Sequence, residues 1–211
     1  MMNFDISEWE EVSSTSLSDA MLGLHTMDAS IKPLNRKMRV VGPAYTVQII
    51  KNDCAIIFKA LQEAPEGSVL VIAAQGTTDV AFLGEIVTKI AQKQGIAGIV
   101  IDGCVRDSLA ISEGAFPVFA RGAVPKIPAA NYLGQVQKTV VCADVVVRPG
   151  DIICADADGI VAVPAEKTNQ VLQKAMGKEN KDHWKIETMI PNAEALQSYL
   201  SKINEKYKTL S

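Results

Sequence analysis

The chain has 211 residues, of which 48% are hydrophobic and 21% are charged, a composition typical of a globular protein that buries one good core. Its net charge of −3 excludes a general attraction to nucleic acid or to anionic membranes, so we expect neither as a partner. The sequence has no apolar run of transmembrane length, no signal peptide and no CxxC pair, so we expect a cytoplasmic protein with reduced cysteines.

The first part of the chain is predicted to contain two short helices, over 3–12 and 13–24. The second begins with serines that are candidate N-caps and continues with an apolar face. Residues 38–50 are rich in β-branched side chains and predict a strand. Residues 54–64 have apolar side chains at helical spacing, and the turn signal Pro-Glu-Gly-Ser ends that helix.

The middle of the chain alternates between strand and helix patterns. Residues 69–74 form a continuous apolar run, typical of a strand that is buried on both faces. A loop is predicted over 75–79, followed by an amphipathic helix over 80–94. Residues 97–102 predict a second buried strand, and 116–121 a short third one.

Strand patterns dominate the later part of the chain. A strand over 138–147 is followed by a hairpin with a tight turn at 156–159, where two aspartates lack the other ligands of a calcium loop. Helices are predicted over 165–176 and around 193–203. Strands and helices alternate early and strands run together late, so the predicted class is mixed α/β, in one domain over 1–211.

A charged pair, Arg106 and Asp107, follows the second buried strand, which we expect to stop at Gly103 so that the chain can turn. Ligands of open α/β sheets bind at the carboxyl ends of the strands, which predicts a polar site here. In that case the two charges need not pair with each other. The alternative is that Asp107 caps a helix that starts at Ser108, while Arg106 is solvated.

Glu85 lies on the preceding predicted helix, with twenty residues between it and Arg106. The alternative is an exposed Glu paired with Lys89 at i,i+4. If two neighbouring strand–helix units bring the carboxyl ends of their strands together, Glu85, Arg106 and Asp107 share one cleft. Two carboxylates without a histidine favour a hard cation such as Mg²⁺, and Arg suits a substrate carboxylate. Free N–H groups of a helix that starts near Gly84 would add a second anion site.

Six segments carry a resemblance to a known family: GPAYTV (42–47), PEGSVLVI (65–72), FLGE (82–85), GIVIDGCVRD (98–107), FPVFARG (116–122) and VVRPGDIICADADGIVAVP (146–164). In this order they resemble the RraA-like family. It includes the 4-hydroxy-4-methyl-2-oxoglutarate/4-carboxy-4-hydroxy-2-oxoadipate aldolases and the regulators of ribonuclease E activity. The resemblance covers about 14–177 and leaves 178–211 as a C-terminal helical extension. It implies a compact β/β/α sandwich assembled as a ring-shaped homotrimer or hexamer.

The resemblance also implies an activity. Aldolase members use a divalent metal, usually Mg²⁺ or Mn²⁺, to cleave 4-hydroxy-2-oxo acids with release of pyruvate, and many decarboxylate oxaloacetate. An acidic residue, twenty intervening residues and Arg-Asp mark them, which here gives Glu85, where Asp is more familiar, with Arg106 and Asp107. Asp107 would hold the metal, and Arg106 would bind the oxo acid and stabilise the pyruvate enolate. Backbone N–H groups around Gly84, Glu85 and Ile86 would bind the substrate carboxylate.

Two features leave alternatives open. Family aldolases use a Glu from the C-terminal region of a neighbouring subunit, for which Glu179 and Glu187 are both candidates. Some members carry an acidic residue shortly after Arg-Asp, where this chain has 108–110 as Ser-Leu-Ala, so the physiological substrate stays open. The competing function is a non-catalytic protein that masks the RNA-binding surface of ribonuclease E. The aldolase spacing favours the lyase, since a pure binding module has no chemical need for it.

Overall fold

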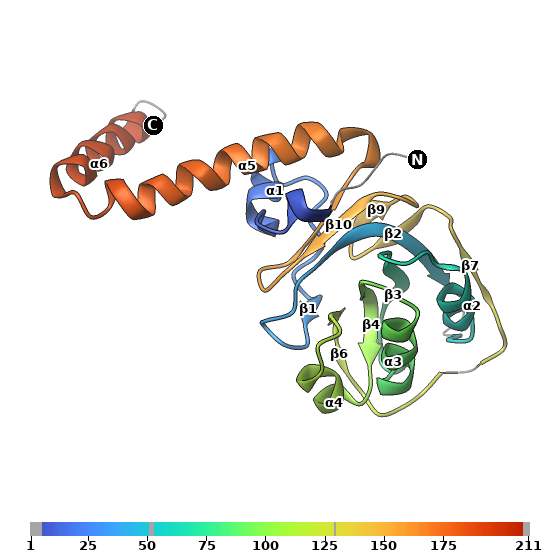
Figure 1. Cartoon of the computed structure of the whole chain (residues 1–211). Helices are drawn as coiled ribbons and strands as arrows, with labels where there is room; N and C mark the ends of the chain where they lie inside the picture. The colour runs from blue at the N-terminus through green and yellow to red at the C-terminus, as the bar shows by residue number, and fades with distance from the viewer. Residues whose placement is uncertain (1–5, 51–52, 129, 209–211) are drawn as a thin grey trace.

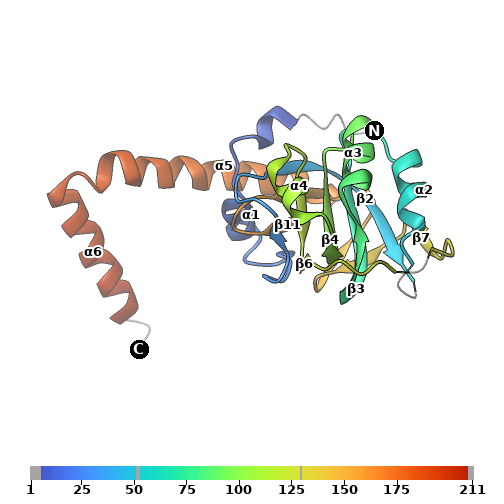
Figure 2. The same ribbon diagram turned by 90° about the horizontal axis from the view of Figure 1, so that it is seen from below.

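A computed structural model of the protein describes residues 6–50, 53–128 and 130–208. A curved sheet with helices around it forms the body, and the last two long helices project from the body as an arm (Figure 1 and Figure 2). None of the helices in these ranges is long and apolar enough to span a membrane. None of the four cysteines, which all lie in these ranges, forms a disulfide.

Nine strands of the described residues form one sheet, whose main path runs β1-β5-β4-β3-β2-β10-β11, with β6 paired to β4 and β7 paired to β2. Strands β8 and β9 form a separate two-stranded ladder. The strand bounds are β1 Lys32–Pro33, β2 Val40–Ile49, β3 Val69–Leu83, β4 Gly98–Val105, β5 Val118–Ala120, β6 Gly122–Ala123, β7 Gly134–Val136, β8 Val140–Cys142, β9 Val145–Val147, β10 Ile152–Ala155 and β11 Ile160–Val163.

The helices lie between and after these strands, and together they confirm the mixed α/β class. Their bounds are α1 Ser14–Ala20, α2 Ile56–Glu63, α3 Glu85–Lys93, α4 Ser108–Glu113, α5 Thr168–Trp184 and α6 Ala193–Lys208, with 3₁₀ turns at Ile6–Trp9 and Ala165–Lys167 and a π-turn at Lys185–Met189. The predicted first helix over 3–12 is therefore only a 3₁₀ turn within its described part. The helix predicted over 54–64 is confirmed as α2.

Strands β2, β3, β4 and β5 are parallel neighbours at the centre of the sheet. The first six residues of β3 and all of β4 are buried, which explains their continuous apolar sequences. Helix α2 packs against β2, and α3 packs against β3 (Figure 1). Parallel strands end at the same edge of a sheet, so β3 and β4 deliver the residues that follow them to one place.

The boundary between strand and helix after the first buried run differs from the prediction. The predicted loop at 75–79 lies inside β3, and 80–83, predicted as helix, belong to the same strand. Gln75 and Gly76 do bend the chain, with left-handed φ of 57° and 70°. Beyond the bend, β3 pairs with β4 again in a shifted register. Residues 80–83 are therefore buried in the sheet as strand. Helix α3 begins only after it.

The prediction that β4 stops at Gly103 is also wrong, because the strand continues to Val105. A Cβ on Gly103 would lie 3.0 Å from the Ala74 Cβ and equally close to the Phe82 ring. The glycine therefore permits close approach of β3 to β4, and the turn comes two residues later than predicted.

The C-terminal predictions are confirmed with one exception. The strand predicted over 138–147 is a hairpin, because Ala143 and Asp144 have positive φ of 46° and 65° and form the two-residue turn between β8 and β9. The tight turn at 156–159 joins β10 to β11 as predicted. Both predicted C-terminal helices are present but longer, as α5 and α6.

Two clusters of buried apolar residues hold the body together. The larger one fills the space around the central strands. The smaller one lies between α1, the root of α5 and strands β10 and β11, and includes Leu17, Val171 and Leu172. The arm is therefore anchored to the body through α5, which contacts the body from Val171 to Glu179 and projects outward beyond that part (Figure 2).

Candidate active site

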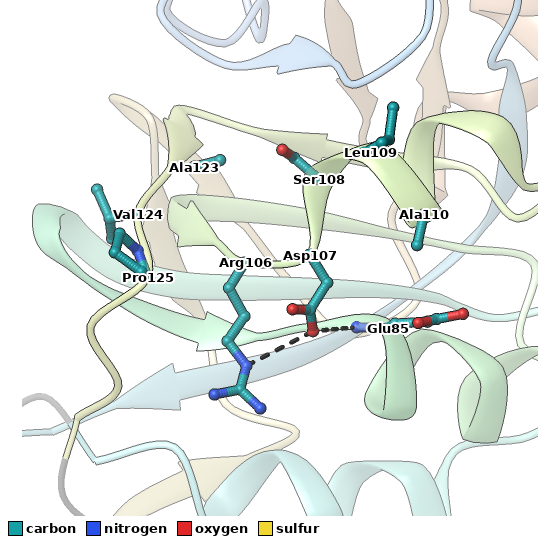
Figure 3. A pocket seen from close by; sticks show the side chains of 9 residues that line it. All are labelled: Glu85, Arg106, Asp107, Ser108, Leu109, Ala110, Ala123, Val124 and Pro125. Atoms are coloured by element: carbon teal, nitrogen blue, oxygen red, sulfur yellow. Dashed lines mark hydrogen bonds and ion pairs between the residues drawn. The ribbon is translucent and has the colours of Figure 1, made fainter.

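The loop after β4 presents Arg106 and Asp107 at one edge of the sheet. The Arg106 amide donates a hydrogen bond to the Leu83 carbonyl over 2.9 Å, so the ends of β3 and β4 are tied together. Asp107 has φ 54° and ψ 36°, a left-handed conformation that is uncommon for a non-glycine residue. The two side chains consequently extend toward the start of α3, away from the Ser108 and Leu109 side chains (Figure 3).

Asp107 caps α3, although it precedes α4. Its Oδ2 accepts a hydrogen bond from the Glu85 amide over 3.1 Å, whereas its side chain makes no capping bond to α4. The alternative, in which the Asp107 side chain caps the helix starting at Ser108, is therefore not what the structure shows. Its negative charge lies at the positive end of the α3 dipole, a favourable arrangement.

Gly84 is the residue that makes this contact possible. A Cβ at this position would collide with Asp107 Oδ2 and would lie 2.8 Å from Arg106 Cγ. The backbone φ of Gly84 is −147°, which other residues adopt, so the requirement is for space rather than for conformation. The glycine thus lets the Arg106–Asp107 pair pack directly on the first turn of α3.

The adjacent charges form only a weak ion pair. Arg106 Nε lies 3.6 Å from Asp107 Oδ2, and each side chain is 42% exposed. A pair this open to solvent contributes less than about 1 kcal/mol. Both charged groups are consequently accessible to a ligand, as expected for a site in which the two need not pair with each other.

Glu85 shares a cleft with the pair but not a direct contact. All three residues line an open cleft of about 670 Å³, together with Ser108–Ala110 and Ala123–Pro125. The Glu85 carboxylate points away from Asp107, and it is the Glu85 backbone that contacts the pair (Figure 3). The alternative ion pair between Glu85 and Lys89 is not formed between these two described side chains.

The first turn of α3 carries unused hydrogen-bond donors. The Glu85 amide donates to Asp107, and the Thr88 amide donates to the Gly84 carbonyl over 3.1 Å. Within the described chain, no acceptor faces the amides of Ile86 and Val87, as is usual for the first turn of a helix. Of the predicted carboxylate-binding amides, that of Ile86 therefore remains available, whereas that of Glu85 does not.

The donor set suits a loosely held hard cation and not an enclosed metal centre. Among the described residues, no group of three or more His, Cys, Asp or Glu side chains is placed to hold a metal ion. Asp107 offers one exposed carboxylate, and Mg²⁺ is often held by one or two carboxylates with water and substrate oxygens completing its shell. The residues at this site therefore fit Mg²⁺ or Mn²⁺ bound through Asp107.

The two C-terminal glutamates have different surroundings. Glu179 on α5 accepts hydrogen bonds from the Ser13 amide, over 2.9 Å, and from the Ser13 hydroxyl. Burial alone would raise the pKa of Glu179, but the hydrogen bonds from Ser13 outweigh it and the pKa is lowered. Glu187 is exposed on the π-turn of the arm. That one of them completes a neighbouring subunit's site stays a prediction.

The far wall of the cleft was missed from sequence. Ala123, Val124 and Pro125 have no reactive side chains, so nothing in their types marks them. They reach the cleft because β6 pairs with β4, and the Val124 amide continues this ladder by donating to the Val105 carbonyl over 2.9 Å. Only knowledge of that pairing would have placed them beside Arg106.

Comparisons of sequence and structure relate the chain to known proteins. A family model described as RraA-like (Aldolase/RraA) matches residues 14–162. A protein of Halalkalibacterium halodurans named "Putative 4-hydroxy-4-methyl-2-oxoglutarate aldolase" is 38% identical over 94% of both chains. An uncharacterised Pseudomonas syringae protein of known structure is 30% identical, with a TM-score of 0.81 over 93% of this chain and 92% of its own. The RNA-processing inhibitor RraA from Thermus is 29% identical, with a TM-score of 0.65 over 72% of this chain and 92% of its own.

Proposed function

The chain belongs to the RraA-like family, and from that premise we propose that it is a divalent-metal-dependent lyase. It would cleave 4-hydroxy-2-oxo acids to pyruvate and a second carbonyl compound, and would also decarboxylate oxaloacetate. The main support is that Arg106, Asp107 and the first turn of α3 converge on one open cleft. The aldolase name of the 38% identical relative supports the same reaction class.

Each group in or beside the cleft has a role that follows from its chemistry. The Arg106 guanidinium, 42% exposed, would bind the oxo and carboxylate oxygens of the substrate. Asp107 would hold Mg²⁺ or Mn²⁺, which when bound supplies Lewis acidity toward the 2-oxo acid. The Ile86 amide, at the positive end of α3, would donate to the substrate carboxylate.

The reaction breaks the bond between C3 and C4 of the substrate. The 4-hydroxyl loses its proton and becomes the new carbonyl, while the electron pair of the broken bond stays on the pyruvate fragment as an enolate. Glu85 is the second carboxylate lining the cleft and would accept the hydroxyl proton. Arg106 would stabilise the enolate oxygen, which then yields pyruvate when C3 is protonated. Oxaloacetate loses CO₂ through the same enolate, so one site serves both reactions.

A second candidate function is regulation of ribonuclease E by direct binding. The observation that favours it is the likeness to the Thermus protein described as an RNA-processing inhibitor. A binding surface has no need for Gly84 to bring an Arg-Asp pair onto a helix N-terminus, which is why we place the lyase first.

For the assembly, we propose the ring-shaped homotrimer or hexamer that the family resemblance implies. Light scattering of the purified chain at several concentrations tests this directly. A mass of three or six chains is expected, and a monomer at all concentrations would contradict it.

The lyase is tested by incubating the purified chain and MgCl₂ with oxaloacetate or with 4-hydroxy-4-methyl-2-oxoglutarate, and following pyruvate. We expect pyruvate from at least one substrate, its loss with EDTA and its recovery with excess MgCl₂. Arg106→Ala and Asp107→Ala should each abolish turnover and leave the oligomeric state unchanged. If the assembled, folded wild type forms no metal-dependent pyruvate from either substrate, the lyase proposal is wrong.

A further inference from the structure

A second cavity lies directly beside the proposed catalytic cleft. It has a volume of about 220 Å³ and lies between α2, the end of β3, α3 and the segment around Ile127 and Pro128. Arg106 and Asp107 line both the cleft and this cavity, so they stand between the two spaces. A molecule held by Arg106 can therefore extend from the cleft into the cavity.

The cavity, which we term the apolar pocket, is lined mainly by hydrophobic side chains. Phe82 and Leu83 are each 3% exposed, so these residues of β3 lie deep in the molecule. Phe58, Ile86 and Ile127 are 51–69% exposed and also line the pocket. An exposed patch of large apolar side chains commonly marks a binding site.

The walls of the apolar pocket are held in place on the side of Ile127. Just before it, the Ala81 amide donates to the Lys126 carbonyl over 2.7 Å. Further along the chain, the fully buried Asp53 carboxylate accepts a hydrogen bond from the Asn131 amide. Ile127 thus directly follows a residue whose backbone is held against β3, which reduces the entropy cost of binding.

The charge distribution defines what this pocket can hold. Of the described residues that line it, only Arg106 and Asp107 are charged, and both belong to the side shared with the cleft. A carboxylate placed against Phe82 and Leu83 would lose its hydration, because the free amides of the lining, those of Ile86 and Val87, lie at the start of α3 instead. An apolar group would instead replace water against Phe82 and Leu83, which is favourable.

Building on the proposed lyase function, we propose that the apolar pocket binds an apolar substituent on C4 of the substrate. The preferred substrates are then 4-hydroxy-2-oxo acids with an alkyl or aryl group on C4, in preference to those with a carboxymethyl group there. The volume of about 220 Å³ equals roughly seven water molecules at their share of liquid volume, so it accommodates more than a methyl group.

The substrate series that tests this varies only the C4 substituent. Pyruvate release is measured for 4-hydroxy-2-oxo acids that carry methyl, propyl, phenyl or carboxymethyl on C4. We expect kcat/KM to rise about fourfold for each added methylene up to propyl. The carboxymethyl substrate should be at least tenfold poorer than the methyl one. Equal kcat/KM across the series would overturn the proposal.

Two pocket variants and a control sharpen the test. Phe58→Ala should flatten the dependence on alkyl length, and Ile127→Lys should favour the carboxymethyl substrate by placing a cation beside the pocket. Leu24→Lys is the matched control, because Leu24 is 64% exposed and lines neither cavity. We expect it to keep the wild-type substrate order. A changed order in the control, or an unchanged order in both pocket variants, would contradict the proposal.

Oxaloacetate and oligomeric state separate the possible failures. Oxaloacetate decarboxylation needs no C4 substituent, so its presence with a flat substrate series overturns only the pocket and leaves the lyase. No pyruvate from any substrate overturns both proposals. Light scattering also measures the mass of the assembly formed by Phe58→Ala and by Ile127→Lys. If both variants change that mass but keep the wild-type ranking of substrates by kcat/KM, a second copy of the chain covers the pocket and the proposal is wrong.

Binding without turnover gives an independent measurement. Saturation-transfer NMR with pyruvate and 2-oxohexanoate should show transfer to the terminal methyl of the longer acid, and tighter binding of it, in the wild type. Phe58→Ala should weaken the binding of 2-oxohexanoate and leave the affinity for pyruvate unchanged. Equal affinity of the wild type for both acids would overturn the proposal.

Discussion

At the scale of single residues, the Arg106–Asp107 pair depends on neighbours that have no reactive groups. The sequence identifies the pair through its position after a buried strand. It does not reveal that Asp107 is left-handed or that its carboxylate caps α3, since both depend on how β3 and β4 end beside each other. Gly84 is the residue that links these features.

Replacing Gly84 with alanine should therefore damage the site more than the fold. The added Cβ would collide with Asp107 Oδ2 and force the Arg106–Asp107 pair away from α3. We expect kcat for pyruvate release to fall on the order of 10²-fold, as displacements of about 1 Å in active sites do. The thermal unfolding midpoint should fall by only a few degrees.

Gly177→Ala is the matched control for this change. Gly177 lies within α5, and nothing lies within 4 Å of a Cβ placed there. Alanine is the better helix former, so this variant should keep full activity and gain stability. Wild-type kcat in Gly84→Ala would show that close packing of the pair on α3 is unimportant.

Asp53 provides a second prediction at this scale, based on pH. Its carboxylate is fully buried; burial would raise its pKa, but hydrogen bonds from the amides of Ala55, Asn131, Tyr132 and Leu133 outweigh this and lower the pKa. A carboxyl whose pKa is lower in the folded state stabilises that state above its unfolded pKa. The stabilisation is lost as pH falls through the folded pKa.

We therefore expect Asp53→Asn to lower the urea midpoint at pH 7, with the difference from wild type shrinking as pH falls below 3.8. Asp79→Asn is the control, because the Asp79 side chain is 65% exposed and its change should hardly move the midpoint. A constant difference between wild type and Asp53→Asn from pH 7 to pH 2.5 would refute this interpretation.

At the scale of elements, local patterns located the buried strands but misplaced their ends. The run at 69–74 and the hairpin turn at 156–159 were correct, since burial and turn chemistry act on neighbouring residues. The extension of β3 over 75–83 and the pairing of β6 with β4 were not predicted. Both depend on partner strands distant in sequence, which no local pattern encodes. The far wall of the cleft was missed for the same reason.

The C-terminal glutamates offer a prediction that distinguishes a structural role from a catalytic one. Glu179 joins α5 to the start of α1 through Ser13, so Glu179→Gln should cost about 1 kcal/mol of stability and leave kcat intact. Glu187 is exposed on the arm, and within the described chain its side chain forms no ion pair. If the arm completes a neighbouring site, Glu187→Gln should lower kcat and leave stability unchanged.

Denaturant unfolding and pyruvate release, measured on both variants, check this assignment. Ser13→Ala combined with Glu179→Gln should cost less than the sum of the two single changes, because the two side chains share one interaction. A fall in kcat for Glu179→Gln, with its stability preserved, would reverse the roles of the two glutamates.

At the scale of the whole molecule, the arm is the feature that a single chain leaves unexplained. Helices α5 and α6 project from the body (Figure 1 and Figure 2). The arm carries large exposed apolar side chains. They include Trp184, Ile186, Ile190 and Leu200, which are 44–59% exposed. Apolar side chains gathered in this way are normally covered in the functional assembly, so we expect the arm to pack against another copy.

Tryptophan fluorescence can measure this directly, because the chain has only two tryptophans and they differ in exposure. Trp9 is buried at 2% exposure, whereas Trp184 is 56% exposed in the single chain. If another copy covers the arm, acrylamide should quench both weakly at high protein concentration, and Trp184 should become strongly quenched when dilution separates the copies. Trp184→Phe assigns the signal, since its remaining fluorescence comes from Trp9 alone. Strong quenching of Trp184 at every concentration, in a sample that light scattering shows to be assembled, would mean that the copies associate through the body and leave the arm free.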